Sequence, residues 1–160
     1  MNLSKSSFLE LMAAGLKAVE CHKDELSALD GATGDGDHGI AICEAMGAAV
    51  DAANTDSDFK TMLTDMAFAT MTSTSGSTST LIGAWLLGMA DGALKDELSP
   101  EENAQLFAAG LKNVREQTKA DIGDKTLMDA LIPATEALDA NHAEGLPLMF
   151  GKAAAEADSG

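Results

Sequence analysis

The sequence is poor in the residues that favour β-sheets. It contains no tyrosine, aromatic residues make up 4% of it, and its only valines are Val19, Val50 and Val114. β-branched and aromatic side chains are enriched in strands, whereas alanine, leucine and methionine, which are abundant here, favour helices. With 160 residues, 46% of them hydrophobic, the chain is long enough for one domain with a sizeable core and short for two. We therefore expect an all-α fold in a single domain.

Cysteines and long hydrophobic segments are also scarce. Cys21 and Cys43 are too few for a disulfide framework. The N-terminal segment is interrupted by Glu10 before the core of a signal peptide can develop. The longest apolar run, Leu81 to Ala90, falls short of the roughly 18 to 20 residues that a membrane-spanning helix needs. The sequence therefore predicts a cytoplasmic protein.

Basic residues are few compared with acidic ones. Lysine and arginine together number 10, against 26 aspartates and glutamates, and the formal net charge at pH 7 is -16. A field of this sign repels the backbone of nucleic acids and anionic lipid surfaces. We therefore expect neither nucleic acid nor a membrane as a partner, and a phosphate ligand would need a cation to accompany it.

Hydrophobic residues recur at helical spacing along most of the chain, and turn segments divide the pattern into about seven amphipathic helices. The helices are expected to begin near Ser7, Asp37, Phe59, Leu81, Ser99, Thr126 and Pro147, the first running to Leu26 and the last fraying over residues 153–160. Ser7 and Ser99 each have a glutamate three residues later, which is the spacing of a capping box. Pro133 is expected to kink its helix. These features predict a compact antiparallel helical bundle or barrel.

Residues 29 to 41, LDGATGDGDHGIA, contain two overlapping motifs. One is the G-x-G-x-x-G spacing of a dinucleotide-binding loop, formed by Gly34, Gly36 and Gly39. The other is a group of three aspartates, namely Asp30, Asp35 and Asp37. A dinucleotide loop follows a strand, whereas the segment before this loop has a helical pattern and a charged turn. The glycines therefore do not by themselves indicate dinucleotide binding.

The three aspartates are better explained by a metal ion. Two like charges 4 Å apart repel by about 4 kcal/mol at an effective dielectric constant of about 20, and a divalent cation removes this cost. An EF-hand loop is excluded, because Ala41 and Met46 stand where its bidentate glutamate would be. Three oxygen ligands with open positions suit Mg²⁺, which keeps water and phosphate oxygens in its shell. The loop therefore predicts a Mg²⁺-phosphate site, and the alternative is an exposed acidic turn that caps the next helix.

Two further segments have patterns that suit an anion site. TSTSGSTST, residues 72 to 80, is either a flexible linker or an anion site at a helix N-terminus formed by Ser77 to Thr80. IGDKTLMDALIPA, residues 122 to 134, is a glycine turn before a helix and lacks the spacing of a Walker A loop. Its Lys125 either belongs to a structural turn or balances charge near the acidic loop, and the sequence leaves both open.

Three segments together resemble the nucleotide-binding L subunit of dihydroxyacetone kinase, the DAK2 domain family. They are LDGATGDGDHG, STSGSTSTLIGAWLLG and GDKTLMDALIPA, and they occur in the family's order. The resemblance implies an antiparallel barrel of amphipathic helices with a Mg-nucleotide, ADP or ATP, at one end. It implies two Mg²⁺ ions held by Asp30, Asp35 and Asp37. It also implies a set of nucleotide contacts: phosphate contacts at His38, Gly39, Ile40, Ala41, Ser79 and Thr80, and a contact near the adenine at Leu127.

The reaction implied by the resemblance is phosphoryl transfer to dihydroxyacetone or a similar small ketose, held by a separate K subunit. The phosphoryl donor is either ATP or an ADP cofactor that a phosphotransferase-system subunit rephosphorylates. Such catalysis depends on positioning and charge neutralisation, so no residue of this chain is assigned as catalytic. The alternatives are a non-catalytic nucleotide- or metal-binding regulator and a small-molecule carrier related to the fatty-acid kinase domain.

The chain departs from the family pattern in three places. Ile40, Ala41 and Ile42 replace T-N-M, which removes a polar contact to the nucleotide. The segment from Gly76 to Thr80 replaces the glycine-rich GGASG. The family's C-terminal lid over the nucleotide has no counterpart before Gly160, so residues 1–160 are expected to form a single DAK2-like domain without it.

Overall fold

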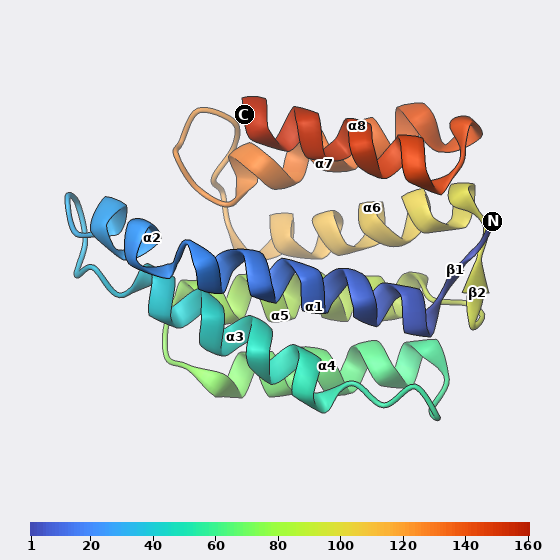
Figure 1. The fold of residues 1–160 in the computed structure, drawn as a ribbon, viewed down its shortest axis with the longest axis horizontal. Helices are drawn as coiled ribbons and strands as arrows, with labels where there is room; N and C mark the ends of the chain where they lie inside the picture. The colour runs from blue at the N-terminus through green and yellow to red at the C-terminus, as the bar shows by residue number, and fades with distance from the viewer.

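The computed structural model describes residues 1–160 and is almost entirely helical (Figure 1). The eight α-helices are α1 (Lys5–Cys21), α2 (Lys23–Asp30), α3 (His38–Ala52), α4 (Phe59–Ser73), α5 (Ser77–Gly92), α6 (Pro100–Gln117), α7 (Met128–Asn141) and α8 (Leu146–Ser159). The remaining elements are a 3₁₀ turn η1 (His142–Glu144) and two short strands, β1 (Leu3–Ser4) and β2 (Glu97–Leu98), paired antiparallel with Leu3 opposite Leu98. The predicted all-α class is confirmed.

The long helices run side by side in alternating directions and form an antiparallel bundle (Figure 1). From α3 to α8 each α-helix packs against the next, α1 packs against α3, and the short α2 packs across the start of α3. The β1–β2 pair lies at the opposite end of the bundle from the loop that follows α2 (Figure 1). The bundle therefore has two distinct ends, and the acidic glycine loop lies at one of them.

The core is built mainly from methionine, leucine and alanine with two buried phenylalanines. Met62, Met66, Leu86 and Leu106 have no exposed surface, and Phe8 packs edge-to-face against Phe59 with ring centroids 5.5 Å apart. A smaller buried cluster joins α6 to the start of α7: it consists of Leu111, Val114, Met128 and Ile132. None of the helices combines the length and the apolar character that crossing a membrane requires.

The prediction of one helix from Ser7 to Leu26 is wrong, because the helix begins earlier, at Lys5, and the segment is divided into α1 and α2. Ser4 is the residue that caps α1, because its Oγ accepts a hydrogen bond from the Ser7 N–H at 3.1 Å. At His22 the backbone leaves the helical conformation (φ -107°, ψ 10°), and α2 begins at the next residue. Asp24 and Glu25 lie in the first turn of α2, where acidic side chains stabilise a new helix N-terminus. This break accounts for the eighth helix.

Two other predicted boundaries are also wrong. The helix expected to begin near Leu81 begins at Ser77, after Gly76, whose φ of 139° suits glycine. Because α4 also continues to Ser73, the flexible linker is excluded as one of the two alternatives for residues 72–80. The last helix does not fray over residues 153–160, because α8 continues to Ser159. α7 runs through Pro133 without interruption, and the kink expected there remains a prediction.

The predicted capping box at Ser99 is confirmed. The Ser99 Oγ accepts from the Glu102 N–H at 3.3 Å, and the Glu102 Oε2 accepts from the Ser99 N–H at 2.8 Å. The neighbouring Lys95 ammonium, followed by the Ser99 N–H, lowers the pKa of the Glu102 carboxyl. The start of α6 is therefore fixed by reciprocal hydrogen bonds.

Replacing Ser99 with alanine should reduce the free energy of unfolding by about 1 kcal/mol, because one N–H group of the first turn loses its acceptor. Urea denaturation monitored by circular dichroism measures this change. Ser6→Ala is the matched control, since Ser6 is exposed and its side chain makes no hydrogen bond. Equal stability of the Ser99 and Ser6 variants would contradict the role given to the cap.

Candidate metal and nucleotide site

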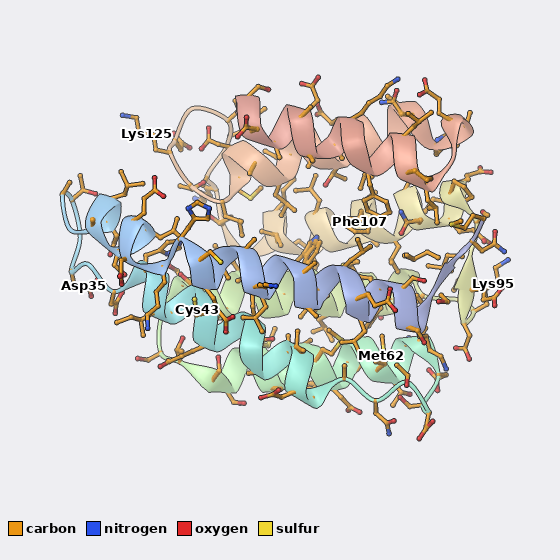
Figure 2. All side chains as sticks on the ribbon, in the orientation of Figure 1. Asp35, Cys43, Met62, Lys95, Phe107 and Lys125 are labelled. Carbon is orange, nitrogen blue, oxygen red and sulfur yellow. The ribbon has the colours of Figure 1, made fainter.

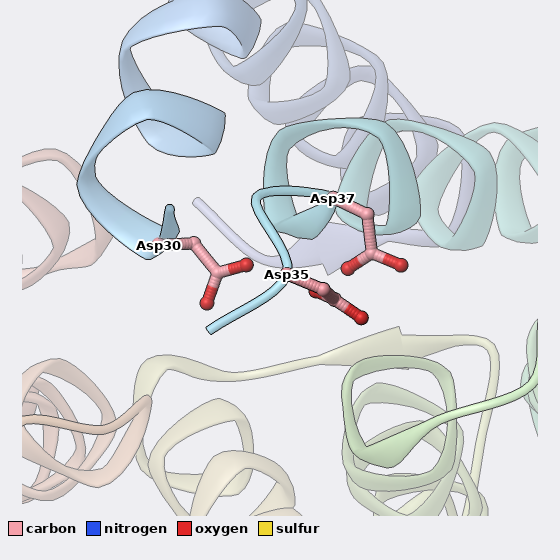
Figure 3. A group of neighbouring side chains, drawn as sticks. All are labelled: Asp30, Asp35 and Asp37. Carbon is pink, nitrogen blue, oxygen red and sulfur yellow. The ribbon is translucent and has the colours of Figure 1, made fainter. Parts of the chain in front are cut away.

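The three predicted metal ligands converge at one end of the bundle. Asp30 is the last residue of α2, Asp35 lies in the loop that follows, and Asp37 immediately precedes α3. One carboxylate oxygen from each lies within 4.8 Å of the others, and the three side chains surround a common region beside the loop (Figure 3). Asp35 and Asp37 are exposed and Asp30 is half-buried. The arrangement offers several hard oxygen donors to one small volume, which is the donor set that Mg²⁺ prefers.

The loop is folded around the Asp30 side chain. The Asp30 Oδ2 accepts a hydrogen bond from the Gly36 N–H at 2.9 Å, and the Asp30 carbonyl accepts one from the Gly34 N–H at 2.6 Å. A Cβ on Gly34 would lie 2.7 Å from the Asp30 Oδ1, and Gly36 has a φ of 78°. Both positions therefore require glycine if the loop is to close on the carboxylate.

The neighbouring carboxylates perturb Asp37 electrostatically. The carboxyl of Asp35, through hydrogen bonding and through its charge, raises the pKa of Asp37. Desolvation and the charge of Asp30 raise it further, whereas His38 lowers it. A carboxyl whose pKa is raised by like charges is stabilised either by a proton or by a bound cation. The site therefore has the electrostatic character of a cation site.

Gly39 joins the metal loop to the rest of the fold. Its N–H donates to the Ser27 Oγ at 3.2 Å, and a Cβ at this position would lie 1.9 Å from the Lys23 carbonyl oxygen. The residue is buried where α2 crosses the start of α3. Its N–H, predicted to contact phosphate, is engaged within the protein, so the direct structural role of Gly39 is to allow this close helix crossing. The phosphate contact remains a prediction.

A cavity of about 330 Å³ lies beside the metal loop, between the first turns of α3 and α5 and the connection from α6 to α7. His38 and Thr78 lie on its wall, and the His38 Nδ1 and Thr78 Oγ1 are 3.3 Å apart. The apolar part of the wall includes Leu81, Leu127 and Met128. The cavity is thus lined by both polar and apolar side chains, and His38 brings part of the polar lining next to Asp37 in the sequence, so the wall could accept a ligand that has both charged and apolar parts.

The other residues predicted to contact phosphate lie in different surroundings. Ile40 and Ala41 border a shallow pocket on another side of Asp37, together with Glu44 and the turn before α5. Ser79 is buried, and its hydroxyl donates to the Thr74 carbonyl at 3.0 Å. The Thr80 hydroxyl is exposed and donates to the Gly76 carbonyl at 2.9 Å. These two hydroxyls are used within the first turn of α5.

Sequence reasoning identified part of the cavity wall only loosely and missed the rest. Of the candidate anion site Ser77 to Thr80, Ser77 and Thr78 line the cavity, whereas Ser79 and Thr80, which the resemblance selects, do not; Thr118 and Thr126 also belong to the wall. The signal for Ser77 and Thr78 was present in the hydroxyl-rich turn, but choosing among its residues requires knowing where α5 begins. Thr118 joins the wall only through the tertiary fold, and nothing in its local sequence indicates this position.

Lys125 does not neutralise the acidic loop. It makes no ion pair, and its backbone has a φ of 57°, which is uncommon for a residue with a side chain. Figure 2 shows Lys125 and Asp35 at the same end of the bundle, with the lysine side chain extending away from the protein. Of the two alternatives left by the sequence, the structural turn is the one that the structure supports.

Comparison with known proteins identifies the family of this chain. Residues 32–160 match the family model of the DAK2 domain. The chain is 32% identical over 125 residues to the ADP-binding subunit DhaL of PEP-dependent dihydroxyacetone kinase 2 from Listeria innocua, a match covering 75% of this chain and 58% of that protein. It is 26% identical over 164 residues to the ADP-binding subunit DhaL of PEP-dependent dihydroxyacetone kinase from Escherichia coli, covering 99% of this chain and 78% of that protein.

A third relative has a longer chain. This is L-erythrulose kinase from Pectobacterium atrosepticum, which is 33% identical over 149 residues, covering 86% of this chain and 25% of that protein. The resemblance inferred from three short segments is therefore confirmed over most of the sequence. Since the family model extends over residues 32–160, from the glycine loop to the end of α8, the chain belongs to the DAK2 domain family.

Proposed function

We propose that this protein is the Mg-nucleotide-binding subunit of a dihydroxyacetone kinase. In this proposal it binds ADP or ATP and presents the terminal phosphoryl group to dihydroxyacetone, or a similar small ketose, held by a separate K subunit. The observation that carries the proposal is the convergence of three carboxylates, with oxygens within 4.8 Å of one another, beside a cavity that has a polar and an apolar side. The names of the DhaL relatives, which are ADP-binding subunits, support the choice of nucleotide.

Metal ions are central to the proposal because the cavity contains no cation of its own. Neither lysine nor arginine lines it, and the chain has a formal net charge of -16. Asp30, Asp35 and Asp37 would hold two Mg²⁺ ions, which when bound neutralise the phosphates and the charge that develops during transfer. Nucleotide binding is therefore expected to depend on Mg²⁺ to an unusual degree.

The cavity wall suggests how the nucleotide is oriented. His38 and Thr78 border the end next to Asp37 and are in position to hydrogen-bond phosphate oxygens. The N–H groups of the first turn of α5, and those of the first turn of α3 other than the Gly39 N–H, favour an anion. Leu81 and Leu127 offer an apolar surface for the adenine. Because the Ser79 and Thr80 hydroxyls are engaged, we assign any phosphate contact there to the backbone.

The names of the relatives, rather than the site, support a choice of phosphoryl source. The DhaL relatives from Listeria innocua and Escherichia coli are named PEP-dependent, and one from Lactococcus lactis is named PTS-dependent. We therefore propose that ADP remains bound as a cofactor and is rephosphorylated by a phosphotransferase-system subunit. Use of ATP as the direct donor is the alternative. Since the chain spans 58% of the length of the Listeria relative, substrate and partners are part of the proposal.

A reconstituted transfer assay tests the proposed function. The protein is mixed with a K subunit loaded with dihydroxyacetone, and dihydroxyacetone phosphate is measured with Mg-ATP, or with ADP and a phosphotransferase-system donor. We expect product with the wild type and with Asp51→Asn, an exposed control on α3, and none with Asp35→Asn. Mg-ADP binding without transfer under either condition would favour the non-catalytic regulator.

The affinity for Mg²⁺ should fall as the solution becomes acidic. The pKa of Asp37 is raised, chiefly by Asp35, so a proton competes with the metal at a pH above the ordinary titration range of aspartate. Mg²⁺ binding at about pH 5.5 should therefore release protons and be weaker than at about pH 7.5. Calorimetry in two buffers of different ionisation enthalpy measures both effects. An affinity that is constant over this range, without proton release, would contradict the coupling.

A further inference from the structure

The connection between α6 and α7, residues 118–127, forms one wall of the cavity and packs against the core only at Ala120. Thr118, Ala120, Thr126 and Leu127 face the cavity. Residues 121 to 127 are nevertheless all exposed, and Leu127 retains 39% of its surface. Burial of apolar surface therefore contributes little to holding this wall in place, and polar contacts must supply the constraint.

One side chain of α7 ties two points of the connection to that helix. Asp129, in the first turn of α7, accepts two hydrogen bonds from the connection: its Oδ1 from the Gly123 N–H at 2.6 Å and its Oδ2 from the Thr126 N–H at 2.8 Å. The hydrogen bond from Gly123, and after it the one from Thr126, lowers the pKa of the Asp129 carboxyl. Between the two donors the chain makes a tight turn, with a φ of 96° at Gly123 and 57° at Lys125.

The two hydrogen bonds that Asp129 accepts, which we call the Asp129 clamp, act next to Leu127, a residue that lines the cavity. Leu127 lies between Thr126, which Asp129 holds, and Met128, which has no exposed surface and whose N–H donates to the Thr126 Oγ1 at 3.2 Å. Both neighbours of Leu127 are thus fixed, and its side chain is left facing the cavity. Hydrogen bonds to an ionised carboxylate are about twice as strong as neutral ones, so a single side chain can order this turn.

We propose that Asp129 is a positioning residue for the nucleotide base: by clamping Gly123 and Thr126 it keeps Leu127 against the apolar side of the cavity. Asp129 itself is not among the residues that line the cavity. The inference rests on the proposed function, since it assumes that the cavity receives a nucleotide. It predicts a separation of roles, in which the acidic loop binds the Mg-phosphate part and the Asp129 clamp governs affinity for the base.

Comparing ADP with pyrophosphate, which has no base, tests this separation. Mg-ADP and Mg-pyrophosphate are titrated by calorimetry into the wild type, Asp129→Asn and Asp139→Asn. Asparagine offers one carbonyl oxygen where two acceptors are needed, so it cannot hold both N–H groups. If the wall is then in place about a tenth of the time, the Kd for Mg-ADP rises about tenfold, while that for Mg-pyrophosphate stays within about twofold. Asp139, exposed on the same helix and without a side-chain hydrogen bond, should leave both affinities unchanged.

A second variant tests whether a general folding defect explains the loss of binding. Gly123→Ala disturbs the other side of the clamp, since its φ of 96° is strained for alanine, yet nothing lies within 4 Å of the added Cβ. It should likewise weaken Mg-ADP and spare Mg-pyrophosphate. Equal loss of both ligands in the two variants, or loss of neither, would overturn the role of Asp129. A wild type that binds neither ligand would instead overturn the proposed function.

Discussion

Replacing Asp37 with asparagine should raise the melting temperature of the metal-free protein and weaken Mg-ADP binding by about 100-fold or more. The first effect follows because Asp35, together with Asp30, raises the pKa of Asp37. An acid whose pKa is higher in the folded than in the unfolded state destabilises the fold when ionised. This destabilisation is full at neutral pH and disappears as the pH falls below the folded-state pKa. Asparagine removes it while remaining a good residue before a helix.

The second effect of Asp37→Asn follows from the loss of one anionic ligand. A single carboxylate contributes both charge and a coordination position to Mg²⁺, and loss even of its supporting partners costs about 10- to 100-fold in many metal sites. Thermal melts with and without Mg-ADP measure both effects, with Asp51→Asn as a control of equal charge on the exposed surface of α3. A lower melting temperature in the metal-free state, together with an undiminished shift on adding Mg-ADP, would show that the aspartates do not form a metal site.

Replacing Gly39 with alanine should destabilise the protein by about 1 to 3 kcal/mol and abolish tight Mg-ADP binding. The added Cβ would lie 1.9 Å from the Lys23 carbonyl oxygen, so α2 has to move away from α3. That movement breaks the hydrogen bond between the Gly39 N–H and the Ser27 Oγ. It also displaces Asp30, the last residue of α2, from Asp35 and Asp37. Stability and metal binding are therefore expected to be lost together.

Gly47→Ala is the matched control in the same helix, because nothing lies within 4 Å of a Cβ at that position. Alanine favours the helix over glycine by about 1 kcal/mol, so this variant should be as stable as the wild type or more stable. Urea denaturation and ADP titration with Mg²⁺ measure both properties. If Gly39→Ala behaves like Gly47→Ala, the close crossing of α2 and α3 is not what assembles the loop.

The helical fold could be predicted because its signals are local. Apolar periodicity and the capping box at Ser99 identify helices without any knowledge of their neighbours. The break at His22 could not be predicted in the same way, since residues 20–25 contain no glycine or proline and α2 is held by its packing across α3. The β1–β2 pair was missed because two residues in each strand are too few to show alternation.

The candidate site also has a part that could be predicted from local sequence and a part that could not. The three aspartates lie within eight consecutive positions, Asp30 to Asp37, so a short glycine-rich loop was enough to bring them together. The proximity of His38 and Thr78 joins residues 40 positions apart in the sequence and depends on how α3 and α5 pack. The Asp129 clamp could not be predicted, because the spacing from Thr126 to Asp129 is also that of an ordinary helix cap. Local chemistry was therefore predictable; of the cavity wall, the resemblance named His38 and Leu127, and the rest depended on the tertiary fold.

Calorimetric titration of ADP into the wild-type protein, with excess Mg²⁺ and again with a chelator, tests the central claim most directly. Since the cavity offers no lysine or arginine to the phosphates, we expect binding with Mg²⁺ and an affinity at least about 100-fold lower without it. Binding of equal affinity in both conditions, or no binding in either, would contradict the assignment of Asp30, Asp35 and Asp37 as the ligands of a Mg-nucleotide.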